Sequence, residues 1–562
     1  MSTTPSIEIA QTKKLRHIRH LLDESGITDD DIELYGNYTG KIRLETLQKF
    51  SARPDGKLIL VTAMTPTPHG EGKTLTAIGL GQALAKIGKK AIITLREPSV
   101  GPVFGIKGGA TGGGHAQVLP MERINLDFNG DLPAVTTAHN LLAAMLDTHI
   151  FKGNDLRIDV TNILWKRAMD MNDRSLRQIV IGLGGRVNGV PRESGFVITA
   201  ASEVMAILAL ADSRADLKKR LGEIVVSYNH DRQVVKAKEL QANNAMAVIL
   251  NKAIMPNLVQ TMEHTPALIH AGPFANIAHG TNSVLADKIG LKLADYVVTE
   301  CGFGADLGAE KFFHIVGRAS GIWPSAVTIV ATCRAIKYHG GVADKPESLL
   351  EKENMEAFKK GLENLAVHIQ NMKKFGAPVV VAINRFPFDT AAEIDHIREL
   401  CRKEEVECAP HEAFVKGGAG AVDLAEKVVQ LADSNPHPQP RFLYDLELPV
   451  EEKIRTIARE IYRADDIYLE KRARKKIERF VSLGYGSLPV CIAKTQGSLS
   501  DNPRAIGVPK GWTLTATDAE LSAGAGFLVI ICGDMMLMPG LPKYPAAVNM
   551  DVDEQGNITG LF

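Results

Sequence analysis

Short runs of apolar residues rich in Val and Ile recur along this chain between longer segments with helical spacing. Such runs are typical of strands buried on both faces of a parallel sheet. Two segments between them, at 76–88 and 422–433, carry apolar residues at helical spacing, and strands alternating with such helices form right-handed βαβ units. The pattern therefore predicts an α/β fold built on a parallel sheet. The predicted strands are KLILVTAM (57–64), KAIITLRE (90–97), RQIVIGLGG (177–185), DYVVTECGF (295–303), APVVVAINRF (377–386), LPVCIAKTQ (488–496) and GFLVIICGD (526–534).

The chain has 562 residues, which is more than one hydrophobic core usually organises. We expect a large first domain at 1–365, a second α/β domain at 366–505 and a small C-terminal domain at 506–562. The Pro-containing stretch at 434–449 reads as a connector.

A phosphate-binding loop follows the first predicted strand directly. The string TPTPHGEGKTLT (65–76) stands between that strand and a helical segment, which is the context that a P-loop requires. In this reading the first domain is a P-loop NTPase-like parallel sheet, backbone N–H groups bind phosphate oxygens, Lys73 neutralises phosphate charge and the Thr74 hydroxyl binds Mg²⁺. The strict pattern has Gly where this chain has Thr67, so the loop geometry must differ at its start. The predicted ATP-binding residues are Thr67, Pro68, His69, Gly70, Glu71, Gly72, Lys73 and Thr74.

The alternative interpretation of this string is a surface turn that contains GEGKT by chance. The preceding strand and the following helix argue against it.

The charge balance excludes several classes of partner. Lys and Arg together number 65, as do Asp and Glu, so no net field draws the chain to nucleic acid or anionic lipid.

The first twenty residues lack the apolar region of a secretory signal, and no run reaches the roughly 18 apolar residues of a membrane span. Six scattered cysteines form no CxxC pair and are expected to be reduced thiols. We therefore expect a cytoplasmic protein that acts on small molecules, without nucleic acid or membrane as a partner.

Several long strings, spread over nearly the whole chain, resemble the formate–tetrahydrofolate ligase (formyltetrahydrofolate synthetase) family. They are too long and unusual to be explained as flexible glycine-rich linkers. Besides the phosphate loop they are GIKGGATGGGH (105–115), GPFANIAHGTNSV (272–284), TECGFGADLGAEKFF (299–313), VATCRAIKYHGG (330–341), NRFPFDT (384–390) and MPGLPKYPAA (538–547).

The resemblance implies an ATP-dependent ligation in two steps. Formate attacks the γ-phosphate of ATP to give formyl phosphate, and N10 of tetrahydrofolate then takes the formyl group, leaving 10-formyltetrahydrofolate, ADP and phosphate. It further implies Mg-ATP and tetrahydrofolate as substrates, a monovalent cation (K⁺ or NH₄⁺) and a homotetramer. The first domain would hold the nucleotide and formyl phosphate, and the second would contribute to the folate pocket.

The resemblance also assigns site residues. Lys73, Arg96 and Glu97 would be catalytic, with the Arg96 guanidinium suited to two oxygens of formyl phosphate. Glu97 and Asp131 would form the monovalent-cation site. The residues expected at the folate pocket, where a flat pterin needs aromatic and apolar walls, are Phe303, Asp306, Asn384, Phe386, Pro387 and Phe414.

At four positions the chain departs from the family pattern. Asp127 and Pro133 stand where relatives usually carry His, which bears on cation dependence and formate placement. Phe414 replaces a usual Trp and Gly497 a usual Tyr, so the folate side of the cleft is expected to differ.

Two alternatives to the ligase remain open. One is another P-loop synthetase that passes an acyl phosphate to a different amine, which substrate screening would reveal. The other is a folate- or nucleotide-binding paralogue without turnover. The presence of Lys73, Thr74 and Arg96 argues against the second alternative.

Overall fold

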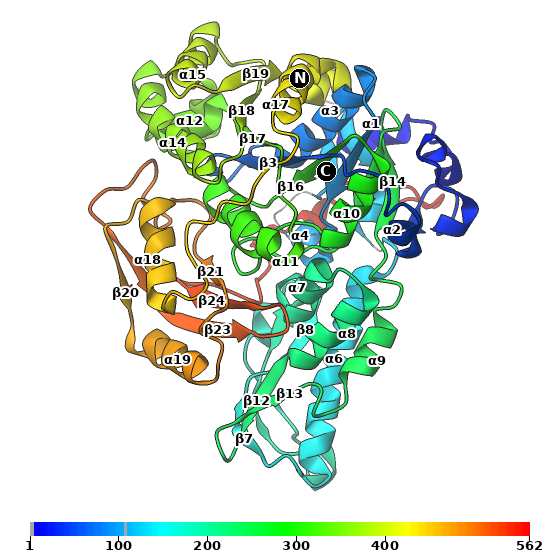
Figure 1. Ribbon diagram of the computed structural model, residues 1–562, viewed down its shortest axis with the longest axis vertical. Helices are drawn as coiled ribbons and strands as arrows, with labels where there is room; N and C mark the ends of the chain where they lie inside the picture. The colour runs from blue at the N-terminus through cyan, green and yellow to red at the C-terminus, as the bar shows by residue number, and fades with distance from the viewer. Residues whose placement is uncertain (1–4, 106–108, 127, 562) are drawn as a thin grey trace.

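One large sheet organises the computed structural model, which describes residues 5–105, 109–126 and 128–561 (Figure 1). Its strands come from both halves of the chain. Two short strands, β5 (Gly112–Gly113) and β6 (Ala116–Leu119), attach to it through β14. Along the sheet the order is β1 (Ile32–Leu34), β2 (Gly40–Ile42), β14 (Asn257–Thr261), β15 (Pro266–Ile269), β4 (Ala91–Leu95), β16 (Tyr296–Glu300), β3 (Lys57–Ala63), β17 (Ala326–Ala331), β18 (Val379–Asn384) and β19 (Glu407–His411).

Along the order from β15 to β19, each strand runs parallel to the next. Four of them, β3, β4, β16 and β18, are predicted strands, and the α/β fold class is confirmed. Because the strands are parallel, their carboxyl ends meet at one edge of the sheet, where ligands bind in open α/β folds.

Helices cover both faces of this sheet because side chains alternate along each strand. Ile59 and Val61 of β3 pack in one core with α3 (Lys73–Lys86) and α17 (Val422–Ser434). Their neighbours Leu58 and Leu60 belong to the core on the other face, together with α14 (Met355–Lys374). Both predicted helices, at 76–88 and 422–433, are thus confirmed as α3 and α17.

An arm extends from the large sheet at one end of the molecule (Figure 1). It contains β7 (Ile158–Ile163), β12 (Val225–Asn229) and β13 (Val234–Lys236), which form an antiparallel sheet. The helices beside it are α6 (Asp131–Phe151), α8 (Arg214–Glu223) and α9 (Asn243–Ile249).

The strand predicted at 177–185 is wrong as a buried parallel strand. The structure has a short antiparallel hairpin of β9 (Ile179–Ile181) and β10 (Arg192–Ser194), with Val180 exposed. Glycines with positive φ, among them Gly182 and Gly184, turn the chain directly after the apolar run, so it cannot continue into a sheet.

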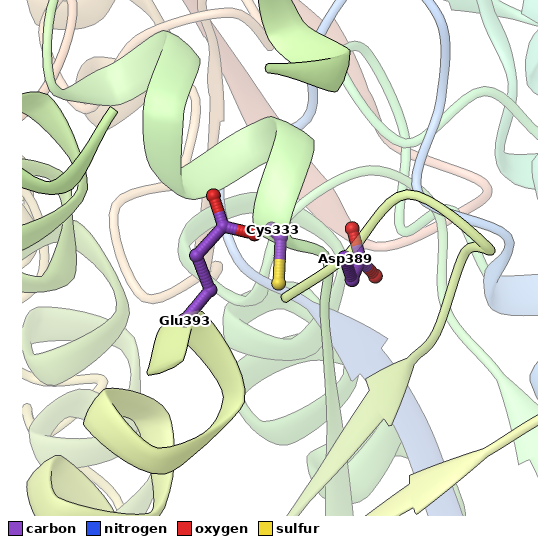
Figure 2. Close-up of side chains that lie close together, drawn as sticks. All are labelled: Cys333, Asp389 and Glu393. Carbon is purple, nitrogen blue, oxygen red and sulfur yellow. The ribbon is translucent and has the colours of Figure 1, made fainter. Parts of the chain in front are cut away.

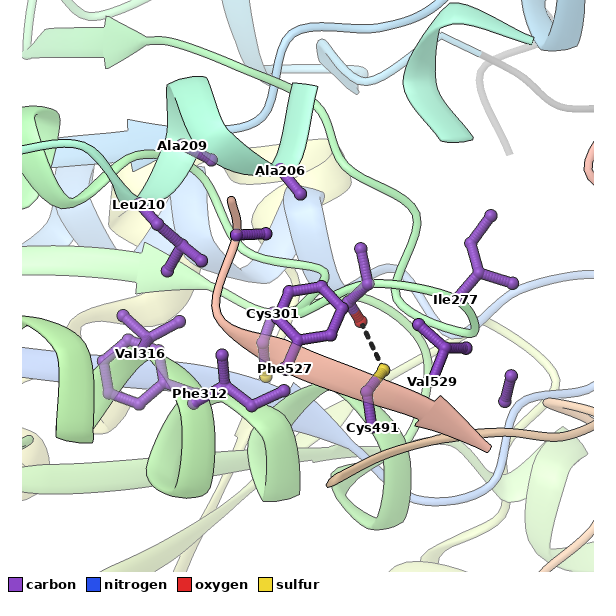
Figure 3. Packing of buried hydrophobic residues seen from close by; sticks show 14 of the residues in the cluster. Ala206, Ala209, Leu210, Ile277, Cys301, Phe312, Val316, Cys491, Phe527 and Val529 are labelled. Carbon is purple, nitrogen blue, oxygen red and sulfur yellow. Dashed lines mark hydrogen bonds between the residues drawn. The ribbon is translucent and has the colours of Figure 1, made fainter. Parts of the chain in front are cut away.

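The segment at 450–531 contains a smaller sheet beside α18 (Val450–Glu460) and α19 (Lys471–Ser482). Its order is β21 (Val490–Ala493), β24 (Phe527–Ile531) and β23 (Asp518–Ser522), so the two predicted strands at 488–496 and 526–534 are confirmed, as a parallel pair. Figure 3 shows how it packs: Phe527 and Val529 of β24 lie among Ala206 and Phe312 from earlier parts of the chain.

One continuous core joins these parts. It includes residues of β3, β18, β21 and β24, from Leu58 to Cys532. The boundary expected after residue 365 lies inside α14, and β17 and β18 on either side of it pair in one sheet. The threefold domain division remains a prediction. The stretch at 434–449 has no helix or strand after Ser434, as expected of a connector. Among the described helices, none is both long and apolar enough to cross a membrane.

Candidate active site

Candidate residues from distant parts of the chain meet at the carboxyl edge of the parallel strands. The phosphate loop follows β3, Arg96 follows β4, and Glu300 ends β16. Thr332 follows β17 and Asn384 ends β18. The order of the strands therefore places five separate segments around one point.

The phosphate loop is held in shape by the side chain of Glu71, which is 1% exposed. One carboxylate oxygen accepts the backbone N–H of Thr67 at 2.7 Å, and the other accepts the hydroxyl of Thr332. The Asn384 amide donates to the Glu71 carbonyl at 3.2 Å. The Glu71 side chain is thus structural and points inward, while the loop tip at 68–70 is exposed.

The loop ends at Gly72, which begins α3 in the left-handed conformation (φ 74°). A Cβ atom there would lie 2.5 Å from the Asn384 amide nitrogen, so this position has room only for glycine. Lys73 and Thr74 follow in the first turn of the helix, where the helix dipole favours an anion.

The start of the loop is anchored through Thr65, immediately after β3. His339 donates from Nε2 to the Thr65 carbonyl at 2.9 Å, and His368 accepts the Thr65 N–H at Nε2, also at 2.9 Å. The amide of Asn364 bonds the Thr65 hydroxyl at 3.0 Å and the carbonyl of Gly507 at 2.9 Å. Burial lowers the pKa of His368 to about 4, so this ring is neutral at neutral pH.

Three charged side chains, those of Lys73, Arg96 and Glu300, lie close together at the start of α3. Burial lowers the pKa of Lys73, and the nearby charges of Glu300 and Glu71 act in the opposite direction. The Thr74 hydroxyl donates to Glu300 at 2.7 Å, and Arg96 Nε lies 3.9 Å from the other oxygen of Glu300. Arg96 Nε is buried and has no hydrogen-bond partner among the described residues. The structure thus brings together Lys73, Thr74 and Arg96, as predicted.

Glu300 is a candidate site residue that the sequence analysis did not single out. An acidic residue at the end of a buried apolar strand was the available signal, because a carboxylate there must face a partner or a ligand.

The predicted pair of Glu97 and Asp131 is also brought together, and both residues are buried. Burial, and next the charge of Asp131, raise the pKa of Glu97 well above its usual value. Asp131 accepts hydrogen bonds from the Lys41 ammonium at 2.7 and 2.9 Å and from the Asn257 amide at 2.7 Å. Lys41 was not foreseen. Glu97 Oε2 is buried without a hydrogen-bond partner in the described part of the chain.

Asn384, Phe386 and Pro387 lie beside the phosphate loop, because β18 ends there. The Phe386 ring stacks on Phe388, with centroids 5.4 Å apart, and the Arg334 guanidinium lies 4.3 Å from its centroid.

The other predicted folate residues have different surroundings. Phe303 follows β16 with φ 59°, a conformation rare for an aromatic residue and often found at functional sites. Asp306 is fully buried and pairs with Lys494 at 2.8 Å. Phe414, on α16 (Ala413–Lys416), packs against Gly113 and Gly114. Their contacts with folate remain predictions.

The family departures have local explanations in part. Pro133 lies in the first turn of α6, where a backbone N–H has no helical partner, so proline is tolerated. Gly497 bonds the Thr495 hydroxyl through its N–H at 3.3 Å. Asp127 lies outside the described residues, as do residues 106–108 of the glycine-rich string.

A buried cluster of Cys333, Asp389 and Glu393 anchors the loop that carries Phe386 (Figure 2). Its donor atoms are close enough to hold a metal ion, but the Lys337 ammonium lies 2.9 Å from Glu393 and already balances a charge. Asp389 accepts the Phe386 N–H at 2.8 Å, and burial raises the pKa of this carboxyl to about 6. The cluster therefore has a structural role: it holds the loop that carries Phe386 against α12 (Cys333–His339).

The chain was compared with models of known protein families. The model described as formate–tetrahydrofolate ligase matches residues 4–562. The match therefore includes every segment that meets at the candidate site.

Proposed function

The chain belongs to the formate–tetrahydrofolate ligase family and is an enzyme of that kind, and on this premise we propose that it uses ATP to activate formate as formyl phosphate. The observation that carries the proposal is the loop after β3, which leads into α3 with Lys73 and faces Arg96 and Glu300. In this proposal the sheet edge works as a P-loop NTPase-like nucleotide site, with phosphate at the backbone N–H groups of residues 67–74.

The proposed reaction has two balanced steps. A formate oxygen attacks the γ-phosphorus and ADP leaves, which converts an unreactive carboxylate into an anhydride with a good leaving group. N10 of tetrahydrofolate then attacks the formyl carbon and loses its proton, and phosphate leaves with one oxygen from formate and takes up one proton. Lys73 and Arg96 would stabilise the charge on the transferring phosphoryl group. Arg96 Nε has no hydrogen-bond partner among the described residues and would donate to this group.

The residues at the start of α3 fit a magnesium ion. The Thr74 hydroxyl and the Glu300 carboxylate lie within 2.7 Å of each other, and Mg²⁺ prefers such oxygen ligands. The ion would supply charge neutralisation of the β- and γ-phosphates. Thr74 and Glu300 would orient it next to Lys73.

A monovalent cation fits the carboxyl pair less completely. The Lys41 ammonium already bonds the Asp131 carboxylate. The buried Glu97 Oε2 has no hydrogen-bond partner among the described residues, so it would be available as a ligand for the cation. We propose that Glu97 is the main cation ligand, with Asp131 as the second.

For folate we propose a site built around Phe386 and Pro387, next to Asn384. The partly exposed Phe386 ring would stack on the pterin, and Phe303, Asp306 and Phe414 would complete the pocket. The segment at 366–505 would contribute most of this pocket, in line with the position of β18.

A coupled assay tests the proposal. Purified protein would be incubated with Mg-ATP, formate, K⁺ and tetrahydrofolate, and product would be measured by absorbance after acid conversion to the methenyl form. We expect product that depends on each substrate and disappears in Lys73→Ala. Formyl transfer to another amine would support the alternative synthetase, and binding of ATP and folate without product would support the inactive paralogue.

A further inference from the structure

The first turn of α12 contacts the phosphate loop and the Phe386 loop with three consecutive side chains. Thr332 donates to Glu71 in the phosphate loop, and Cys333 lies against Asp389 in the loop that carries Phe386. The third side chain, Arg334, contacts both loops at once.

Arg334 lies in a narrow space between the two loops. One guanidinium nitrogen lies 3.5 Å from the Gly70 carbonyl of the phosphate loop, and the Arg334 Cζ lies 4.3 Å from the centroid of the Phe386 ring. The Arg334 side chain is only 12% exposed, and its Nε is buried with no hydrogen-bond partner in the described residues. A planar guanidinium is suited to this position because it stacks on an aromatic ring and still donates in its own plane.

A salt bridge fixes the outer side of Arg334. Its guanidinium donates to Glu347 at 2.8 Å, and the same carboxylate oxygen lies 3.6 Å from His69 at the tip of the phosphate loop. The Gly70 carbonyl, the Phe386 ring and the Glu347 carboxylate therefore orient the guanidinium. Gly70 belongs to the phosphate loop, and Glu347 contacts it through His69.

We propose that Arg334 is a positioning residue that couples the nucleotide site to the folate site, so that a ligand in either site strengthens binding in the other. The proposal rests on the proposed function, because it takes the loop at 67–74 as the nucleotide site and Phe386 as the pterin platform.

The sign of the coupling follows from the geometry. Phosphate bound to the N–H groups of the loop orders Gly70, whose carbonyl then holds the guanidinium against Phe386. The pterin meets a ring whose orientation is already restricted, so its binding loses less conformational entropy. By thermodynamic reciprocity, folate improves nucleotide binding by the same factor.

Binding measurements on the full-length protein test the proposal. Titration calorimetry would give the Kd of Mg-ADP with and without saturating tetrahydrofolate, and formate would be left out so that no turnover occurs. Arg334→Gln removes the planar guanidinium and its charge. Arg334→Lys keeps the charge, but an ammonium cannot contact the Gly70 carbonyl and stack on the Phe386 ring at the same time. Arg398→Gln, at an exposed arginine on α15 (Ala391–Lys403), is the matched control for the change in net charge.

For the wild type and Arg398→Gln we expect tetrahydrofolate to lower the Kd of Mg-ADP about fivefold or more, within the usual range of coupling between sites. In both Arg334 variants the ratio should fall to about one, while each ligand still binds alone. The readout is the ratio of the Kd of Mg-ADP without tetrahydrofolate to the Kd with it. A variant that is only destabilised would bind both ligands more weakly but would keep this ratio.

Wild-type coupling that persists in Arg334→Gln and Arg334→Lys would overturn the proposal, as would two ligands that bind the wild type independently. These outcomes leave the ligase function intact, because the coupled assay would still detect product. A wild type that forms no product and binds no folate would instead remove the proposed function and the coupling together.

Discussion

The residues that shape the phosphate loop work through buried hydrogen bonds to distant partners. Glu71 is the clearest case, since its two oxygens accept hydrogen bonds from Thr67, four residues before it, and from Thr332, between β17 and α12. A carboxylate buried in this way is retained only where it is fully bonded. The base of the loop is therefore preorganised, which lowers the entropy lost when phosphate binds, while the exposed tip at 68–70 lies outside these bonds.

We predict that Gly72→Ala damages nucleotide use more than stability. A left-handed backbone costs a non-glycine residue about 1–2 kcal/mol, and the new methyl group would also displace Asn384. The kcat/KM for ATP should fall about ten- to hundredfold because the loop shifts relative to Lys73. Steady-state kinetics at varied ATP would measure the change.

Gly88→Ala is the matched control. Gly88 lies just past the same helix with φ +78°, but no atom lies within 4 Å of a Cβ built there. It should lose similar stability and keep its kinetics. Equal kinetic losses in the two variants would show that strain alone, and not the contact with Asn384, explains the effect.

From the sequence alone, the candidate site residues that can be predicted are those marked by a local motif. Lys73 and Thr74 follow from the loop-to-helix pattern, and the resemblance supplied Arg96 and Glu97. Lys41 and His368 could not be predicted, because their partners are hundreds of residues away in some cases and no local pattern marks them. Glu300 could have been predicted, because it is an acidic residue at the end of a buried apolar strand.

The element that positions the loop is the end of β3, where Thr65 is held by α12 and α14. His339 lies on α12 and His368 on α14, and both rings bond the same residue. The two helices pack on each other as well as on the sheet edge, so a shift of either would move the loop.

We predict that the stabilising effect of His368 is lost as the pH falls. The ring is neutral in the folded protein because burial lowers its pKa from 6.5 to about 4, whereas the unfolded chain binds a proton near 6.5. The contribution is therefore complete above pH 6.5 and declines as the pH falls toward 4. At pH 5 the loss amounts to about 2 kcal/mol.

His368→Gln provides the comparison, since glutamine offers an acceptor that does not titrate. Urea unfolding at pH 7.5 and pH 5 should show the variant less stable at pH 7.5, with the gap to wild type smaller by about 2 kcal/mol at pH 5. A gap that does not change with pH would mean that His368 is not held neutral by the fold.

Among the elements, long apolar runs between helical segments were predicted well. The runs that became β3, β4, β16 and β18 are Val- and Ile-rich and lie between helices, so burial on both faces is the only stable solution. The run at 177–185 shares the Val and Ile residues but ends in three closely spaced glycines, and its Val180 is exposed. Composition alone cannot separate the two cases, because the difference lies in what packs on the strand.

The whole chain behaves as one packed body in which the smaller sheet shares a core with the large one. Cys491 of β21 reaches the carbonyl of Ala278 with its thiol at 3.7 Å, and Figure 3 shows this contact inside the shared core. The threefold domain division stays a prediction, since length indicates several cores but does not say which strands will pair across them.

We predict a homotetramer, as the family resemblance implies. One chain has a mass of 60.9 kDa, so light scattering on the eluted protein should give about four times that value. Large apolar side chains that are exposed on the single chain, such as Leu183 and Val187, provide surface that assembly would bury. A mass of one chain at micromolar concentration would contradict this prediction.

The most direct test of the account follows the oxygen atoms of formate. The enzyme would turn over formate labelled with ¹⁸O at both oxygens, together with unlabelled ATP and tetrahydrofolate, and the phosphate would be analysed by mass spectrometry. Activation as formyl phosphate predicts one ¹⁸O atom in each phosphate, in an amount equal to the 10-formyltetrahydrofolate formed. Phosphate without label, released alongside the same product, would show that ATP cleavage does not proceed through formyl phosphate.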